Sequence, residues 1–587
     1  MFFKNKQQGN ANKLLSSTKD LFIKYKTYLF IVLLTMIGLY FRCLDLNKPN
    51  GFWYDEAYCC YDAEASFPFG IFNRVLHQDL HSPLYFFILH FWMKIYGHED
   101  VAVRFLSLLF GVLLIPVLYF AGKELGSKKA GIITAALASV NSLLIYYSQE
   151  VKFYSLLTLL SGLSALFLLK IKNSSKKKYL AGLVITNLAL LYTFPLCTIF
   201  VFFEALIFII YLCFTKKSIK NFIIAQIITL ALYLPYLSLF FQSHAGSSTS
   251  KAIMGQFWWS QFSPVVLLYI IQDWFSFNPI NLCTNPLGFY NMLFASGSII
   301  KIITLLFIPV IIYLIGIIRA LKEKNFTWIL FLVGFSFLIA EIILTLQGRL
   351  ALITRYTLLI LPIMILLAGY GLSKLRYKMT SSVLVSIFII LSIFYLQFSQ
   401  DSTPHWIRSE GLKTVGDILD RYPLDKNDLI IMPHAGLILY RYFDKSKLLD
   451  FDYNSAFLAA NPNLLNKIFP PNLLNFLNKG SSRPLLRGYL ASPYPTSTLE
   501  NYIEKGVINK VPHGRYIVVV RSMNISSYNA PTMGRIVNND AAYNQIPLFI
   551  LLCSKVSNDI SSICNEYLIS VDKVHEDVWD VEIYKKP

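Results

Sequence analysis

The stretch LFIKYKTYLFIVLLTMIGLYF, residues 21–41, is apolar over about 20 residues, enough to cross a bilayer core of about 30 Å. Four lysines precede it, at positions 4, 6, 13 and 19. No small-residue cleavage site follows it, because the next residues are Arg42, Cys43 and Leu44. The pattern predicts an uncleaved membrane anchor whose N-terminal side, residues 1–20, lies in the cytoplasm.

The composition of the whole chain agrees with a membrane protein. Of the 587 residues, 55% are apolar and only 15% are charged, and the mean hydropathy is +0.51. Ordinary soluble domains carry about 25% charged residues, so this composition excludes a wholly soluble chain and a largely disordered one. The net charge of +19 suits either nucleic acid or cytoplasmic membrane loops, and in so apolar a chain it favours the loops.

Ten further apolar runs follow the anchor, and basic clusters separate alternate runs. Placing these clusters in the cytoplasm predicts about eleven transmembrane helices and an outside C-terminus, in agreement with the positive-inside rule. The apolar segment 84–96 is short for a span and is predicted to be an interfacial helix in the first outer loop. The ten runs are 101–122, 130–147, 154–170, 179–194, 196–214, 220–241, 298–320, 326–346, 355–373 and 380–398.

The composition changes near residue 399, where polar residues, Pro and Asn become more frequent. A segment of about 190 residues is long enough for one α/β domain, and the topology puts it outside. The predicted fold is a polytopic α-helical membrane protein, with a membrane domain at 21–398 and an extracytoplasmic C-terminal α/β domain at 399–587. Within the latter, strands are predicted at 429–432, 516–520, 548–552 and 578–584, and a helix at 407–420.

The predicted topology gathers unusual acids on the outer face. Charges this close to spans are costly unless they pair or face a polar cavity, so they indicate function. Asp55 and Glu56 are adjacent just beyond the first span, and an acid pair there suits a general base or the ligands of a hard cation. The alternative is a pair of solvated loop acids.

Basic residues approach the same face at two other outer turns. Arg349 and Arg355 flank a short loop, and guanidinium groups bind phosphate with paired hydrogen bonds. The alternative for them is an anchor that snorkels to the membrane interface. Lys152 follows Glu150 in the turn between two spans, where the alternative is a helix-capping ion pair.

Other motifs narrow the chemistry. His77 and His81 are four residues apart, but the segment between them lacks the glutamate of H-E-x-x-H, which favours polar loop histidines over a zinc hydrolase. The chain contains no G-x-x-x-x-G-K-[ST] and no strand–G-x-G-x-x-G–helix unit. A nucleotide-driven pump is therefore disfavoured.

Five groups of residues resemble, in their order and shared sidedness, the GT-C superfamily of integral membrane glycosyltransferases. The similar branch is that of the protein O-mannosyltransferases and lipid A aminoarabinose transferases, and the resemblance covers about residues 20–375. The family's His-Pro-Pro is His-Ser-Pro here, which leaves the substrate open. The groups are Asp55-Glu56-Ala57; His81 to Tyr85; Gly97, Glu99 and Arg104; Tyr147-Ser148, Glu150 and Tyr154; and Arg355-Tyr356.

The resemblance implies transfer of a hexose or pentose from a polyprenyl-phosphate donor to a protein, lipid A or glycan acceptor. Transfer would occur by inverting displacement on the extracytoplasmic face of the inner (plasma) membrane. No cofactor or metal is required, although adjacent acids suit a divalent cation. The implied site comprises the catalytic residues Asp55 and Glu56, the donor-phosphate ligands Arg355, Arg349 and Lys152, and the substrate contacts Glu150, His81 and Tyr356.

Three other functions remain open. A transporter or flippase of lipid-linked sugars would also need many spans and arginines near lipid phosphate, but transporters commonly show internal repeats, which this sequence lacks. A ligase that joins a glycan to a lipid would use similar groups and differ in its product. A non-enzymatic surface protein would leave the clustered loop acids unexplained.

Overall fold

The computed structural model describes most of the helical part of the chain and five strands of the C-terminal part. Single residues, among them Leu46, Gly51, Phe52, Leu352, Asp273 and Trp274, are described between the longer segments. The longer segments are 27–44, 54–76, 81–174, 176–244, 299–323, 326–347, 354–402, 412–422, 428–431, 448–451, 516–522, 569–576 and 579–585.

Each of the eleven predicted apolar runs coincides with a helix or a pair of helices. An unlabelled helix, Thr27–Cys43, corresponds to the anchor. The others are α5 (Asp100–Leu125), α6 (Lys128–Ser139) with α7 (Ser142–Ser148), α8 (Tyr154–Asn173), α9 (Lys177–Leu191), α10 (Cys197–Phe214), α11 (Lys220–His244), α16 (Ile299–Lys322), α17 (Thr327–Leu346), the short 3₁₀ helix η3 (Thr357–Leu359) with α18 (Leu361–Ser373), and α19 (Lys378–Ser402).

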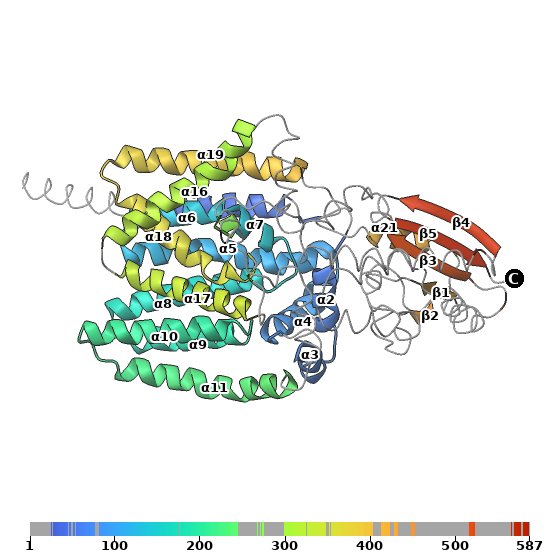
Figure 1. The fold of residues 1–587 in the computed structure, drawn as a ribbon, viewed down its shortest axis with the longest axis horizontal. Coiled ribbons are helices and arrows are strands. Elements are labelled where there is room, and N and C mark those ends of the chain that lie inside the picture. The colour runs from blue at the N-terminus through green and yellow to red at the C-terminus, as the bar shows by residue number, and fades with distance from the viewer. Residues whose placement is uncertain are drawn as a thin grey trace, which may run out of the picture.

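These helices run side by side as a bundle, with α5, α6, α8 and α18 in its middle and α11 and α19 at its edges (Figure 1). The residues of α18 from Leu361 to Leu372 are all buried, whereas α11 exposes Ile227, Leu230 and Leu234. A bundle whose interior and exterior are both apolar is typical of a membrane protein, because lipid replaces water around it.

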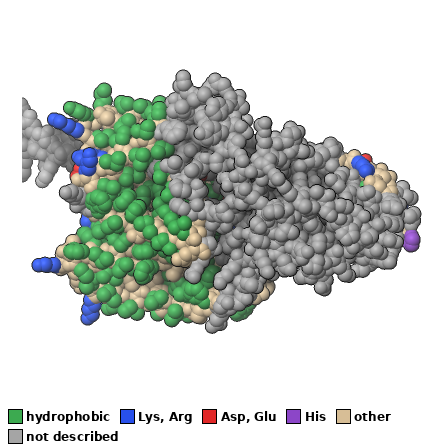
Figure 2. Space-filling view, viewed as in Figure 1, with side chains coloured by type: hydrophobic (Ala, Val, Ile, Leu, Met, Phe, Trp, Pro, Cys, Tyr) green, Lys and Arg blue, Asp and Glu red, His purple; other side chains and the backbone are tan. Residues whose placement is uncertain are grey.

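The lengths and composition of the helices support a membrane location. Five of the described helices are long and apolar enough to cross a membrane, or six if the bent pair α6–α7 forms one span. Figure 2 shows hydrophobic side chains over the visible side of the bundle, and Lys and Arg side chains at the end away from α2, α3 and α4. The protein is therefore a mostly helical, multi-pass membrane protein, and the number of eleven spans stays a prediction.

The run 130–147 differs from the prediction, because it is two helices that bend by 58° rather than one straight span. The break follows from local hydrogen bonding: the side chain of Asn141 caps α7 by accepting from the backbone of Leu144 at 3.0 Å. Arg42, fully buried, donates to the carbonyls of Ala138 and Ser139 at the freed end of α6. A polar side chain thus satisfies carbonyls that the break leaves open.

The segment predicted as the first outer loop contains three short helices at one end of the bundle (Figure 1). They are α2 (Tyr54–Ala63), α3 (Phe69–Arg74) and α4 (Leu84–Tyr96). The segment predicted as an interfacial helix is therefore a helix with the predicted bounds, 84–96. Its face with Tyr85, Phe86 and Leu89 is buried against the rest of the protein.

The C-terminal part contains a five-stranded mixed sheet of order β2-β1-β3-β5-β4. β1 pairs in parallel with β2 and β3, β5 pairs antiparallel with β3 and β4, and α21 packs against β5. The predicted strands near 429, 516 and 578 and part of the predicted helix are confirmed, while 548–552 lies outside the described residues. The elements are β1 (Asp428–Ile431), β2 (Leu448–Phe451), β3 (Tyr516–Ser522), β4 (Ile569–Glu576), β5 (Trp579–Lys585) and α21 (Leu412–Leu419).

Candidate active site

The first turn of α2 carries both predicted acids, Asp55 and Glu56. Acidic side chains are favourable there because the N-terminal end of a helix has a partial positive charge. Consecutive residues on an α-helix are rotated by about 100°, so the two carboxylates point in different directions. The structure therefore gives them different partners and different surroundings.

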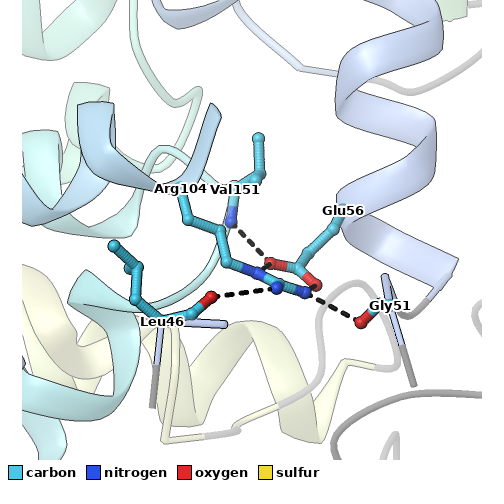
Figure 3. Close-up of polar contacts among 5 residues, drawn as sticks. All are labelled: Leu46, Gly51, Glu56, Arg104 and Val151. Atoms are coloured by element: carbon cyan, nitrogen blue, oxygen red, sulfur yellow. Dashed lines mark hydrogen bonds and ion pairs between the residues drawn. The ribbon is translucent and has the colours of Figure 1, made fainter. Parts of the chain in front are cut away.

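Glu56 is fully buried in an ion pair with Arg104 from α5 (Figure 3). The guanidinium donates from Nε to Oε1 at 2.8 Å and from Nη2 to Oε2 at 2.7 Å, a two-bond arrangement that is among the strong charge-assisted contacts. The backbone N–H of Val151 also donates to Oε1, at 3.1 Å. This geometry supports a positioning role for Glu56, and its predicted catalytic role stays a prediction.

Arg104 also organises the chain around the start of α2. Two further guanidinium hydrogens go to the carbonyls of Leu46 at 3.1 Å and Gly51 at 2.9 Å (Figure 3). The guanidinium also lies over the ring of Phe52. One buried side chain thus joins the segment before α2 to α5 and, through Glu56, to the turn between α7 and α8.

Asp55 lies between two cations that come from distant parts of the sequence. Arg355 donates from Nη1 to Oδ2 of Asp55 at 3.0 Å, and Nζ of Lys152 lies 4.0 Å from the same oxygen. The Asp55 side chain is 24% exposed and that of Arg355 is 26% exposed, whereas Lys152 is almost fully buried. The cluster of these three side chains thus combines one partly exposed carboxylate with two cations.

The surroundings of Asp55 determine its ionisation. Burial by itself raises the pKa of this carboxyl, but Lys152, Arg355 and His81 favour the charged form and together hold the pKa below its ordinary value of 3.8. At neutral pH Asp55 is therefore a carboxylate, able to accept a proton or a hydrogen bond but not to donate one.

Arg355 retains hydrogen-bonding capacity beyond its bond to Asp55. Its Nε–H is buried and makes no hydrogen bond in the structure. The guanidinium lies 5.7 Å from the ring centre of Tyr356, and the phenol of Tyr154 is close enough to interact with it electrostatically. An oxyanion placed beside Arg355 would satisfy the remaining donor.

Aromatic rings line one side of this cluster. The ring of His81 lies 5.0 Å from that of Phe153, and Phe194 lies 5.5 Å from Tyr356. The carbonyl of His81 accepts a hydrogen bond at 2.9 Å from the hydroxyl of Tyr236 on α11. His81 and Tyr356 therefore both lie at the predicted site, and their substrate contacts stay predictions.

The remaining predicted residues have different outcomes. Glu150 is 1% exposed, and its backbone carbonyl accepts from the amide of Lys152 in the turn that carries that lysine. Arg349 and His77 lie outside the described residues.

Sequence reasoning missed two acid-centred contacts. The pairing of Glu56 with Arg104 had a signal, because a charge at the start of a span needs a partner. The contact of Asp273 with Thr354, in which the threonine hydroxyl donates at 2.6 Å, had none. Asp273 lies between predicted elements, and only the tertiary structure brings it to Thr354, the residue before Arg355.

The surroundings of Asp55 and Glu56 offer few ligands for a divalent cation. Within the described part of the chain, no group of three or more His, Cys, Asp or Glu side chains is arranged to hold a metal ion. Glu56 is held on both oxygens by Arg104, and Asp55 faces Arg355. A cation bridging the two acids would have to displace both arginines, and the cofactor requirement stays a prediction.

The solved structures that are similar to this chain include those of two membrane proteins. ArnT from Cupriavidus metallidurans in the apo state is 9% identical, with 94% of this chain and 97% of that chain covered and a TM-score of 0.49. Archaeal oligosaccharyltransferase AglB from Archaeoglobus fulgidus, in complex with an inhibitory peptide and a dolichol-phosphate, is 11% identical. The coverage there is 94% of this chain and 73% of that chain, with a TM-score of 0.45.

No curated protein matches this chain. Residues 80–239 match the model of a family described as dolichyl-phosphate-mannose-protein mannosyltransferase. This match spans α4 to α11 and includes His81, Arg104 and Lys152. Over residues 80–239 it confirms the resemblance of this chain to the protein mannosyltransferases.

Proposed function

We propose that this protein transfers a sugar from a polyprenyl-phosphate donor to an acceptor on the extracytoplasmic face of the membrane, with inversion at the anomeric carbon. The observation that carries the proposal is the contact of Asp55 with Arg355 and Lys152, an accessible carboxylate between two cations. The matched family is described by a dolichyl-phosphate-linked sugar, which supports a donor of this class.

The carboxylate and the cations suit the two ends of a displacement reaction. Asp55 accepts the proton of the acceptor hydroxyl as that oxygen attacks the anomeric carbon. The bond from that carbon to the phosphate oxygen breaks, and polyprenyl phosphate leaves as a monoester with an added negative charge. Arg355 and Lys152 stabilise that charge, and Arg349 is proposed to assist.

The Asp55–Arg355 ion pair also suggests how donor binding prepares the base. A donor phosphate beside Arg355 competes with Asp55 for the guanidinium. When the guanidinium of Arg355 also binds the phosphate, its interaction with Asp55 is weaker and the pKa of Asp55 rises. The carboxylate is then a better proton acceptor when donor is bound. Glu56 and Arg104 keep α2 in place during this exchange.

The active site is proposed to face the outside. The Lys and Arg side chains visible on the bundle lie at the end away from α2, α3 and α4 (Figure 2), which suits a cytoplasmic location for that end. The C-terminal segment 399–587 then lies on the extracytoplasmic side. Clustering of the charged groups at one end argues against a flippase, whose binding site would lie near the middle of the membrane.

The proposal is tested by incubating purified protein in nanodiscs with a panel of polyprenyl-phosphate sugars and with membrane extract as acceptor. Release of polyprenyl phosphate is followed by mass spectrometry. We expect wild type to consume one donor class and Arg355→Ala to lower kcat/KM by about 10²-fold, since a charge-stabilising group is lost.

Arg319→Ala is the matched control, because Arg319 lies in the last turn of α16 and pairs with Glu323 at 2.9 Å. It should behave as wild type. If wild type consumes no donor but moves lipid-linked sugar across a vesicle membrane, the transferase proposal is wrong and the flippase is favoured.

The pH dependence provides a separate prediction. Lys152→Met removes a charge that lowers the pKa of Asp55, so that pKa should rise. Because the carboxylate is the active form, the acid limb of log kcat/KM against pH should move to higher pH than in wild type. Lys170→Met breaks an ion pair with Glu124 at the opposite end of α8 from Lys152, and it should leave the limb unchanged. An unmoved limb in Lys152→Met would exclude Asp55 as the titrating base.

A further inference from the structure

The turn that carries Arg355 is held by two consecutive residues from a distant segment, Asp273 and Trp274. Thr354 donates its hydroxyl to Oδ2 of Asp273 at 2.6 Å, and Trp274 donates its indole N–H to the hydroxyl of Thr357 at 2.8 Å. Both members of the distant pair are buried, with 3% and 6% exposure. Both hydrogen bonds are therefore shielded from water. A buried donor or acceptor that loses its partner there costs free energy of folding.

The two threonines that make these hydrogen bonds, Thr354 and Thr357, lie on either side of Arg355 and Tyr356 in the sequence. They are also joined to each other, because the hydroxyl of Thr357 donates to the carbonyl of Thr354 at 2.8 Å. The amide of Thr357 donates to the same carbonyl at 3.1 Å. The turn therefore has one side fixed to Asp273 and Trp274, while Arg355 extends from it to Asp55.

Trp274 also contacts a residue that supports the turn of Lys152, the other cation of the site. The carbonyl of Trp274 accepts from the side-chain amide of Asn141 at 2.7 Å, and Asn141 caps α7. The helix α7 leads directly into the turn that contains Lys152. Trp274 thus contacts the supports of both basic residues that flank Asp55.

We propose that Asp273 and Trp274 are positioning residues: they fix the position of the Arg355 side chain relative to Asp55 and the donor phosphate. This inference rests on the proposed function for its kinetic consequence only. Neither residue is assigned a contact with substrate. A displacement of a binding group by about 1 Å lowers rates by about 10²-fold, so a loosened turn should affect donor use strongly.

The test compares Thr354→Val, Thr354→Ser, Trp274→Phe and Thr229→Val in nanodiscs. Valine at 354 keeps the shape of threonine but cannot donate to Asp273, whereas serine keeps the hydroxyl. Thr229→Val is the matched control, because Thr229 is also buried and its hydroxyl donates within α11, at the edge of the bundle.

Two readouts are measured on each variant. Hydrogen–deuterium exchange of the peptide that contains Thr357 and Ile360 reports the turn directly, since both amides donate within it. Donor turnover reports kcat and KM separately. We expect Thr354→Val and Trp274→Phe to exchange faster and to lose about 10-fold or more in kcat/KM for donor, with Thr354→Ser near wild type.

The outcomes separate this inference from the proposed function. Exchange in Thr354→Val at the wild-type rate would overturn the positioning role, and so would faster exchange with unchanged donor kinetics. If wild type consumes no donor, the proposed function fails. The exchange rates, compared with the control and the serine variant, then still decide whether Asp273 holds the turn.

Discussion

Asp55→Asn is expected to lower kcat by about 10²–10⁴-fold while leaving the fold intact, because general-base catalysis contributes rate increases of that order. Asparagine has nearly the shape of aspartate and its carbonyl can still accept from Arg355. It cannot take the proton of an acceptor hydroxyl. The loss should therefore appear mainly in kcat, with donor KM changed less.

Release of polyprenyl phosphate in nanodiscs measures the effect, and size-exclusion chromatography with thermal unfolding checks the fold. Asp417→Asn, at an exposed position of α21, is the control for the same chemical change. Wild-type turnover in a folded Asp55→Asn protein would exclude Asp55 as the base. The reaction would then fit an acceptor that is itself an anion, which needs no proton removed.

Arg104→Met is expected to be the most destabilising single substitution in the site. It leaves the carboxylate of Glu56 buried without its charged partner and removes the donors to the carbonyls of Leu46 and Gly51. Removing one member of a buried ion pair costs about 3–5 kcal/mol. Equilibrium unfolding in detergent, compared with wild type, measures this free energy.

The double variant Glu56→Gln/Arg104→Met distinguishes a broken ion pair from a general packing loss. Because the unpaired charge is then absent, the double variant should be more stable than Arg104→Met alone. Arg319→Met controls for loss of an arginine that is partly exposed. Equal stabilities of Arg104→Met and wild type would show that the pair does not hold α2 in place.

These predictions concern residues that the sequence singled out for other reasons. The sequence placed both tandem acids in the catalytic site, whereas in the structure Glu56 is buried in an ion pair with Arg104 and Asp55 is partly exposed beside Arg355 and Lys152. Their helical rotation, together with the position of α5, separates them. No spacing rule for linear motifs carries that information.

The sequence by itself determined the helices, because a run of apolar residues long enough to cross a bilayer can satisfy its backbone only within the helix. It also determined which polar residues were unusual, since ionisable groups beside spans are costly. The exception was the run 130–147, where one asparagine cap and a buried arginine favoured a bend over a straight span.

Only the tertiary structure decided which of those residues meet. Asp55 and Arg355 are 300 positions apart, and Trp274 is 83 positions from Thr357. Hydropathy places each helix in the membrane but is indifferent to its neighbours, because lipid is as apolar as another helix. Contacts between specific side chains select the packing, and here they bring one carboxylate between two cations at one end of the bundle.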